Sequence, residues 1–330
     1  MLDKPKTEKP HSELKTMGSG LEVGATGMQG WRLEMEDAHI VQDLPSKPGH
    51  SLLAVFDGHG GAGAAIWVAD RLIGILEASA EWKRYLKGSK EDPRQVGAAL
   101  REAFLVADQQ LRVFQDEGGP GADTSGCTAV VCVITPLHII CANAGDSRCV
   151  LGTKGTVVEM SFDHKPYDEP ERERIEKAGG TVQFKRVDGD LAVSRALGDF
   201  QFKISEDLPA EQQRVSPEPD IVVHERCAQD EFLLLACDGL WDVMSNIEAT
   251  DIGRSLFHLG EHSMMLFAEE MIDISLDKGS RDNISAVAMK LDGASISKDG
   301  GGVLALRAER SKRAVVSAEK RERGVFDART

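Results

Sequence analysis

The sequence lacks the features that would place it in a membrane, in the secretory pathway or on nucleic acid. No apolar run approaches the ~18 residues of a transmembrane helix. The first residues contain no apolar signal-peptide region, and Leu2 stands where the usual myristoylation signal needs glycine. The net charge of −15 argues against general binding to nucleic-acid phosphates, which needs a basic face. We therefore expect neither a membrane nor a nucleic-acid partner.

Closely spaced cysteine pairs are also missing. The six cysteines lie mostly within apolar runs and form no CxxC pair, so we expect buried, reduced thiols rather than a zinc site. Reduced thiols are typical of an intracellular protein, here of the cytoplasm, the nucleus or both. Nothing in the sequence demands more than a monomer. The cysteines are Cys127, Cys132, Cys141, Cys149, Cys227 and Cys237.

What is present is one large domain between two ends of different composition. Residues 1–20 are polar, rich in Lys and Pro, and are expected to form a flexible lead-in. Residues 21–293 alternate strand-like and helix-like patterns without a clear linker, which indicates a single domain. The tail, residues 294–330, holds nine Lys or Arg and five acidic residues, for a net charge of +4. We expect this basic tail to be flexible; the alternative is a docking or localisation segment, since the rest of the chain is acidic.

The spacing of apolar residues predicts an α+β fold. Helical periodicity covers 61–86, with one break, and 94–114. Further helices are expected at 171–178, 245–259 and 263–277, and a capping box at 245–248 opens the second of these. Consecutive strand runs joined by short Gly or Asp turns indicate antiparallel pairing, and hence a layered α+β fold rather than a parallel doubly wound sheet. The strand runs are 21–28, 38–44, 51–57, 127–135, 138–151, 182–197, 220–225 and 231–238.

Three aspartates stand at the ends of strand runs. Asp57 and Asp238 each follow an apolar run and precede glycine, and Asp282 precedes the run 284–291. In an antiparallel sheet the end of one strand lies beside the start of its neighbour, so these residues could gather on one edge. Carboxylates that meet there repel one another unless a cation joins them. The pattern indicates a metal site, with ordinary turn aspartates as the alternative, because Asp-Gly is also a common turn signal.

The neighbouring residues select the kind of metal and a reaction. Glu34, Glu36 and Asp37 add carboxylates, and no His–Cys cluster accompanies them. Oxygen ligands favour Mg²⁺ or Mn²⁺ over zinc or copper. Two such ions suit in-line attack of water on a phosphoryl group. Arg32 could clamp the phosphate oxygens, and His59 could protonate the leaving alkoxide.

Seven short motifs then occur in a fixed order along the chain. They are Gln29-Gly-Trp-Arg-Leu-Glu-Met-Glu-Asp-Ala-His39, Phe56-Asp-Gly-His-Gly-Gly61, Ser125-Gly-Cys-Thr-Ala129, Asn143-Ala-Gly-Asp-Ser-Arg148, Asp190-Leu-Ala-Val-Ser-Arg-Ala-Leu-Gly-Asp-Phe200, Ala236-Cys-Asp-Gly-Leu-Trp-Asp242 and Ser280-Arg-Asp-Asn-Ile284. Together they closely resemble the type 2C family of metal-dependent serine/threonine protein phosphatases. The resemblance runs from about residue 20 to residue 291, the whole expected domain, and finds no match for the tail.

This resemblance implies a fold, a reaction and cofactors. The fold would be a central sandwich of two antiparallel β-sheets, flanked by α-helices on both faces, with a small flap beside the active site. The substrates would be phosphoserine and phosphothreonine proteins. The cofactors would be two Mg²⁺ or Mn²⁺ ions per site and a third, weaker one. A water or hydroxide bridging the two ions would attack the phosphorus in line.

Matching positions imply the metal ligands. Asp57 would bridge the two ions, and the backbone carbonyl of Gly58 would bind the first. Glu36, Asp238 and Asp282 would complete the shell of the second ion. These assignments come from the resemblance and not from the spacing of the residues.

Further positions match residues that act on the substrate or on water. Arg32 would hold the substrate phosphate, and His59 would be the general acid. Asp146 would bind the third metal, or is a plain hairpin-turn residue. Asp37 and Asp242 would orient metal-bound waters, as acids next to metal ligands often do.

Three supporting positions and the flap complete the set. Asn283 would support the site rather than bind metal, and Thr128 would lie near it or is simply a buried strand residue. The flap is expected at about 163–186, where Arg186 would meet substrate or is a plain surface arginine. Asp188-Gly189-Asp190 is expected to be a hairpin turn and not a metal motif.

Two rival functions follow from the same residues. Some relatives have lost metal ligands, so a catalytically inactive phosphoprotein-binding scaffold of the same fold is the first rival. The complete set of Glu36, Asp57, Asp238 and Asp282 favours the active enzyme. The second rival, an aspartyl-phosphate phosphatase, would need an Asp-x-Asp signature after its first strand, and the sequence has Asp57-Gly-His59 there.

Overall fold

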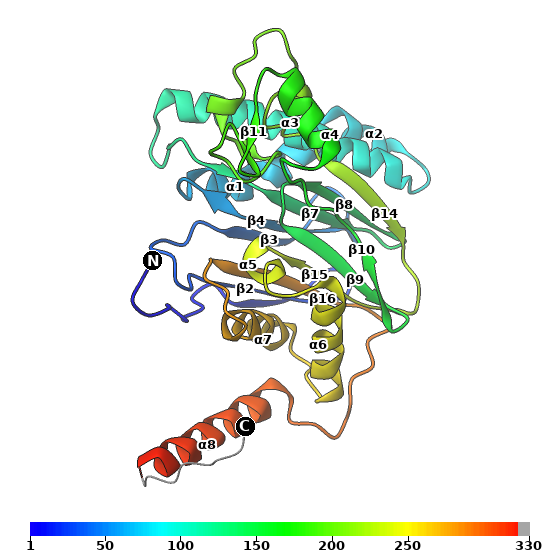
Figure 1. Cartoon of the computed structure of the whole chain (residues 1–330). Coiled ribbons are helices and arrows are strands. Elements are labelled where there is room, and N and C mark those ends of the chain that lie inside the picture. The colour runs from blue at the N-terminus through cyan, green and yellow to red at the C-terminus, as the bar shows by residue number, and fades with distance from the viewer. Residues whose placement is uncertain (323–330) are drawn as a thin grey trace.

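The chain folds into two packed antiparallel sheets with helices on both outer faces, as predicted (Figure 1). The computed structural model describes residues 1–322. Side chains from both sheets meet in a core between them, where Val23 and Leu233 of one sheet are buried with Leu53 and Val130 of the other. The inner strands of each sheet are covered on both faces and are nearly continuous apolar runs, whereas the outermost strands are partly exposed.

One sheet has six strands in the order β1-β2-β16-β15-β9-β10, and every neighbouring pair is antiparallel. The register pairs Ala236 with Ala286, so the end of one strand lies beside the start of the next. The strands are β1 (Glu13–Thr16), β2 (Glu22–Met28), β16 (Ile284–Lys290), β15 (Asp230–Ala236), β9 (Arg148–Thr153) and β10 (Thr156–Glu159).

The second sheet has five strands in the order β14-β8-β7-β4-β3, again all antiparallel. Its outer face packs on three helices, and the predicted break in the first helical segment lies at Ser79, whose hydroxyl caps the next helix. The strands are β14 (Asp220–Glu225), β8 (His138–Ala144), β7 (Ala129–Ile134), β4 (Ser51–Phe56) and β3 (Ala38–Asp43). The helices are α1 (Gly63–Ala78), α2 (Ala80–Lys87) and α3 (Pro93–Glu117).

Helices on the other side cover the six-stranded sheet (Figure 1). Half of the predicted capping box forms: the Ser245 hydroxyl accepts the Glu248 backbone N–H at the start of α6, whereas the Glu248 carboxylate pairs with Lys278. No helix in residues 1–322 is long and apolar enough to cross a membrane. These covering helices are α5 (Asp238–Trp241), α6 (Asn246–His258) and α7 (Met264–Asp277), and α8 (Gly302–Glu322) lies beyond them, against α6 and α7 (Figure 1).

The strand block predicted at 182–197, with a turn at 188–190, forms far less strand than expected. Only short pairs form there, and the apolar residues of this block instead build a small separate core with Ile175 and Phe202. The Asp188-Gly189-Asp190 segment is a turn, as predicted, closed by the antiparallel bridge of Val187 with Leu191. The elements are α4 (Glu169–Lys177), β11 (Val182–Gln183), β12 (Arg186–Val187), β13 (Leu197–Gly198), β5 (Gly58–His59), β6 (Gly126–Cys127) and two 3-10 turns (Phe200–Phe202, Ala210–Gln212).

Parts of both ends of the chain, for which the sequence predicts flexible segments, contact the domain in the described structure. Within residues 1–20, β1 pairs with β2, and Lys6 pairs with Gly30 through two backbone hydrogen bonds. Within the tail, α8 lies against α6 and α7, where Arg307 forms ion pairs with the acidic face of α7. Charge complementarity explains this contact, since the tail is basic and the rest of the chain acidic. Residues 323–330 lie outside the described part of the tail.

Candidate active site

The three aspartates that end or open strands do converge on one edge of the sandwich. Asp57 follows β4 of the five-stranded sheet, whereas Asp238 follows β15 and Asp282 precedes β16 of the six-stranded sheet. Burial, and then repulsion by Asp37, Asp238, Asp146 and Asp282, raises the pKa of Asp57 well above its ordinary value. Such mutual repulsion requires that these carboxylates face one another.

Two further carboxyl groups, those of Asp238 and Asp37, also have raised pKa values. Burial, followed by the charges of Asp146 and Asp282, raises the pKa of Asp238 to about 8. Burial raises the pKa of Asp37 to about 6, and both of its carboxylate oxygens are buried without a hydrogen-bond partner in the described chain. A buried carboxylate without a partner is costly unless a cation binds it. The cluster therefore fits hard divalent cations, for which carboxylate oxygens are the preferred ligands.

One thiol lies beside these acids. Single ligand atoms of Asp37, Asp57 and Cys237 lie within 4.8 Å of one another. The Cys237 sulfur is already engaged, because it accepts the Ser285 N–H and donates to the Asn283 carbonyl. The oxygen atoms thus remain the available ligands, in keeping with Mg²⁺ or Mn²⁺.

Asn283 fixes the loop that carries Glu36. Its amide oxygen accepts the Glu36 N–H at 2.9 Å, and its NH₂ group donates to the carbonyls of Gln29 and Glu34 at 2.8 and 2.9 Å. The Glu36 carboxylate accepts the backbone N–H of Gly61 at 2.7 Å, on the turn after β5. This buried side chain therefore joins the start of β16 to the 29–36 loop.

Gly58 lies in close contact with the same loop. A Cβ atom at Gly58 would come within 2.2 Å of the Glu36 carbonyl oxygen. This close packing against Glu36 leaves only glycine possible at position 58.

Thr128 also contacts the site. Its backbone N–H donates to the Asp57 carbonyl at 2.9 Å, and its hydroxyl pairs with the Ser147 hydroxyl at 2.7 Å. Thr128 is thus both a buried strand-end residue and a neighbour of the site.

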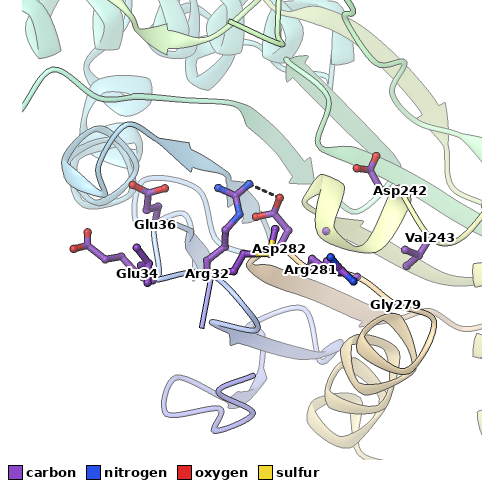
Figure 2. A pocket seen from close by; sticks show the side chains of 12 residues that line it. Arg32, Glu34, Glu36, Asp242, Val243, Gly279, Arg281 and Asp282 are labelled. Atoms are coloured by element: carbon purple, nitrogen blue, oxygen red, sulfur yellow. Dashed lines mark hydrogen bonds and ion pairs between the residues drawn. The ribbon is translucent and has the colours of Figure 1, made fainter. Parts of the chain in front are cut away.

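Arg32 and Asp282 point toward each other in the lining of an open cleft of 740 Å³ (Figure 2). Arg32 Nη2 lies 2.6 Å from Asp282 Oδ2, and the Arg32 side chain is half-exposed. Glu36 and Asp242 line the same cleft on opposite sides of this pair (Figure 2). The guanidinium is thus placed where an incoming anion can reach it from solvent.

His59 faces an acid that the sequence did not single out. His59 Nε2 lies 2.6 Å from Asp199 Oδ2, and the Asp199 side chain is buried. Burial lowers the pKa of His59, but the charge and hydrogen bond of Asp199 outweigh it, so that the pKa is raised overall. Asp199 therefore favours the protonated imidazolium, the form that can donate a proton.

Asp146 faces a second unexpected partner. Lys165 Nζ lies 2.6 Å from Asp146 Oδ2, and both residues stand at the base of the expected flap. Burial raises the pKa of Asp242, which lies one helical turn after Asp238. Asp146 and Asp242 thus both belong to the electrostatic surroundings of Asp238.

Arg186 lies apart from this cluster. It stands on the exposed hairpin β11–β12, where its Nη1 donates to the Asp190 carbonyl at 2.6 Å. No contact found within residues 1–322 connects Arg186 to the acid cluster. The position is that of a surface arginine on the flap.

Sequence reasoning missed Asp199 and Lys165. Asp199 lies in the motif 190–200, which supported the resemblance but received no role. Its partner stands 140 residues away, so only the fold brings them together. Lys165 carried no signal beyond its place in the flap.

Comparisons with known proteins agree with this geometry. The family model described as Protein phosphatase 2C matches residues 21–284. Protein phosphatase 1B of Mus musculus is 42% identical over 291 residues, which are 87% of this chain and 74% of that protein. Probable protein phosphatase 1N of Homo sapiens is 43% identical over 292 residues, 88% of this chain and 65% of that protein. The chain thus spans 65–74% of the length of these relatives.

A solved structure supports the fold independently. The serine-threonine phosphatase 2C from Toxoplasma gondii superposes with a TM-score of 0.71 at 23% identity, covering 88% of this chain and 98% of that one. The family model and the relatives establish more than the fold. The chain therefore belongs to the protein phosphatase 2C family of serine/threonine protein phosphatases, which are metal-dependent.

Proposed function

We propose that this chain hydrolyses phosphoserine and phosphothreonine in proteins, with two Mg²⁺ or Mn²⁺ ions in the acid cluster. The single observation that carries the proposal is the convergence of Asp57 and Asp238, whose pKa values are raised, with Asp282 beside Arg32 and His59. Bound ions would supply an activated water and neutralise charge on the phosphoryl group. The residues that would hold them are Glu36, Asp57, the Gly58 carbonyl, Asp238 and Asp282, with Asp146 at a third, weaker position.

The other residues act on the substrate itself. Arg32 binds the phosphate oxygens, and the half-exposed cleft around it admits a phosphorylated side chain. His59 gives its proton to the leaving serine or threonine oxygen, and Asp199 holds the imidazole in place and protonated. Asn283 keeps the Glu36 loop in register with β16. A monomer is sufficient for this reaction, because the described chain supplies every residue named.

The rival function is a scaffold that binds phosphoproteins without cleaving them. It predicts a loss of at least one acid from the cluster, whereas all of them are present. The presence of the general acid His59 and its partner Asp199 also favours catalysis, since phosphate binding alone does not need them.

The first test is phosphate release from a phosphothreonine peptide, with Mn²⁺ or Mg²⁺ and with EDTA. We expect metal-dependent release, and a loss of at least about 10³-fold in Asp238→Ala, because the metal supplies several kcal/mol of transition-state stabilisation. Asp190→Ala is the matched control, since that side chain lies exposed on the turn next to β12, and it should keep activity. A folded protein that releases no phosphate with either metal would instead support the scaffold.

The second test asks whether His59 protonates the leaving group and whether Asp199 supports it in that role. His59→Gln should slow hydrolysis of a phosphoserine peptide by roughly 10²-fold or more, but p-nitrophenyl phosphate far less, because its phenolate leaves without a proton. Asp199→Asn should shift the pH–rate profile to lower pH, since the pKa of His59 falls when the neighbouring charge is removed. Equal slowing of both substrates in His59→Gln would contradict the general-acid role.

A further inference from the structure

A second group of metal-ligating side chains lies at the other end of the sandwich. His224, Cys227 and Asp230 each offer a ligand atom, and the three atoms lie within 4.8 Å of one another. Asp230 is the first residue of β15, whereas the active-site Asp238 follows the last residue of that strand. At ~3.3 Å per residue, the two groups are roughly 20 Å apart along the strand. The second group therefore takes no part in phosphate hydrolysis.

The three side chains already converge on one point. Asp230 Oδ2 lies 2.9 Å from His224 Nε2, and the Cys227 thiol donates to Asp230 Oδ1 at 3.2 Å. The backbone N–H of Cys227 also donates to Asp230 Oδ2, at 2.9 Å, which holds the turn closed around the carboxylate. In a tetrahedral zinc site, metal–ligand bonds of about 2.0–2.3 Å place donor atoms roughly 3.3–3.8 Å apart. The ligand atoms need to move only slightly to reach that spacing.

The kinds of ligand select the ion. A thiol and an imidazole favour a borderline-soft cation such as Zn²⁺ and disfavour Mg²⁺, which takes oxygen ligands. We propose that His224, Cys227 and Asp230 form a Zn²⁺-binding site. The Cys227 thiol would release its proton to solvent and bind as the thiolate, and the neutral His224 imidazole would bind through Nε2 with its proton on Nδ1. Cys227 is the one cysteine that is not buried, and the His224 side chain is 20% exposed, so that an ion and a fourth ligand from solvent can reach the site.

A thiol beside a carboxylate and an imidazole could also be read as a nucleophile. The geometry argues against that role, because the thiol donates its proton to a carboxylate, and a neighbouring negative charge disfavours the thiolate. A bound cation, in contrast, is stabilised both by the negative charge of the Asp230 carboxylate and by the thiolate that Cys227 forms when it binds the ion. The arrangement is therefore that of a binding site and not of a second catalytic centre.

The place of the site in the fold indicates what the ion would do. The turn between β14 and β15 carries the chain from the five-stranded sheet to the six-stranded sheet. His224 lies on the strand before this turn and Asp230 on the strand after it, so that a bound ion would tie the two sheets together at this corner. We expect Zn²⁺ to stabilise the fold, since a ligand that binds only the folded state shifts the unfolding equilibrium.

The test is a titration of the full chain with Co²⁺, a spectroscopic substitute for Zn²⁺, with excess Mg²⁺ present to occupy the oxygen-ligand sites. We expect a thiolate-to-cobalt charge-transfer band that saturates at one equivalent and is displaced by Zn²⁺. Cys227→Ser should abolish the band, and His224→Gln should weaken Co²⁺ binding by at least the ~10–100-fold that loss of a supporting partner already costs. In the wild type, but not in Cys227→Ser, Zn²⁺ should raise Tm.

The matched control is Cys237→Ser, since Cys237 is the thiol that lies near the active-site acids. The band should persist in that variant. A wild type without the band, a band that survives in Cys227→Ser, or a band that disappears in Cys237→Ser would each overturn the proposal. Circular dichroism of every variant checks that the fold is retained, and His224→Gln keeps the test decisive if Cys227→Ser does not fold.

Discussion

Two groups of carboxylates in this molecule have opposite surroundings. On α7, the side chain of Glu270 is fully buried, yet Arg307 and Arg310 both contact it. At the active-site edge, Asp57 and Asp238 are surrounded mainly by other acids. Arginines of the chain itself neutralise the carboxylates on α7, whereas the carboxylates at the active-site edge need positive charge from a bound cation. The number of acids in a cluster therefore says less about metal binding than the absence of a partner does.

The α7 group also draws in both ends of the described chain. Arg307 contacts Glu269 and Asp273 at 3.0 Å each, and Lys9 contacts Asp273 at 2.6 Å. At the active-site edge, by contrast, the two cations found close by, Arg32 and Lys165, each pair with a single acid. This comparison can be tested by changing the charge in each group and measuring stability.

The largest effect is expected from pH in the metal-free protein. Burial and then the neighbouring acids raise the pKa of Asp238 to about 8. Protonation of Asp238 thus stabilises the fold fully below its ordinary pKa of 3.8, and this contribution is lost as the pH rises through about 8. In EDTA, Asp238→Asn should be more stable than the wild type by at least about 2 kcal/mol at high pH and similar to it near pH ~4.

Urea denaturation of the two proteins across this pH range measures the difference. Saturating Mg²⁺ should reverse its sign, because the wild type then gains metal binding that the variant has lost. A difference in the free energy of unfolding that does not depend on pH would show that Asp238 is not repelled by its neighbours.

A smaller effect is expected at α7. Arg310→Ala should lower the free energy of unfolding by about 1–2 kcal/mol, because it leaves part of the charge of the buried Glu270 uncompensated while Arg307 remains. Activity on p-nitrophenyl phosphate should be unchanged. Arg313→Ala is the matched control on the same helix; its pair with Glu309 is exposed, so its effect should stay within about 0.5 kcal/mol. Equal effects of the two substitutions would mean that burial of Glu270 does not matter.

The sandwich and most of its elements could be predicted because their patterns are local. Six of the eight strand runs named from the sequence match strands within a few residues, and the run 138–151 contains two strands, β8 and β9, of different sheets. The break before α2 follows from a capping serine. The run 182–197 failed because its apolar residues serve a small core of the flap, where short turns bury them as well as a sheet would. Apolar content alone does not distinguish these two cases.

Part of the candidate site could be predicted because some of its residues are also marked by a local sequence pattern. Asp57, Asp238 and Asp282 are marked by their places at strand ends, and the antiparallel order brings them together. Asp199 carries no such mark, since its role depends on a contact with His59 across 140 residues. The α8 contact was only partly predictable, because the opposite net charges favour docking of the tail but do not say which acids of α7 it meets.

The sharing of the acid cluster between two sheets has a consequence for how the enzyme matures. Asp57 comes from one layer and Asp238 and Asp282 from the other, so neither layer alone carries a usable ligand set. A chain emerging from the ribosome acquires the last of these residues, Asp282, only after β15 and α7 have been made and just before β16. Catalysis therefore cannot begin on a half-built molecule, and the onset of activity reports that the two layers have closed on each other.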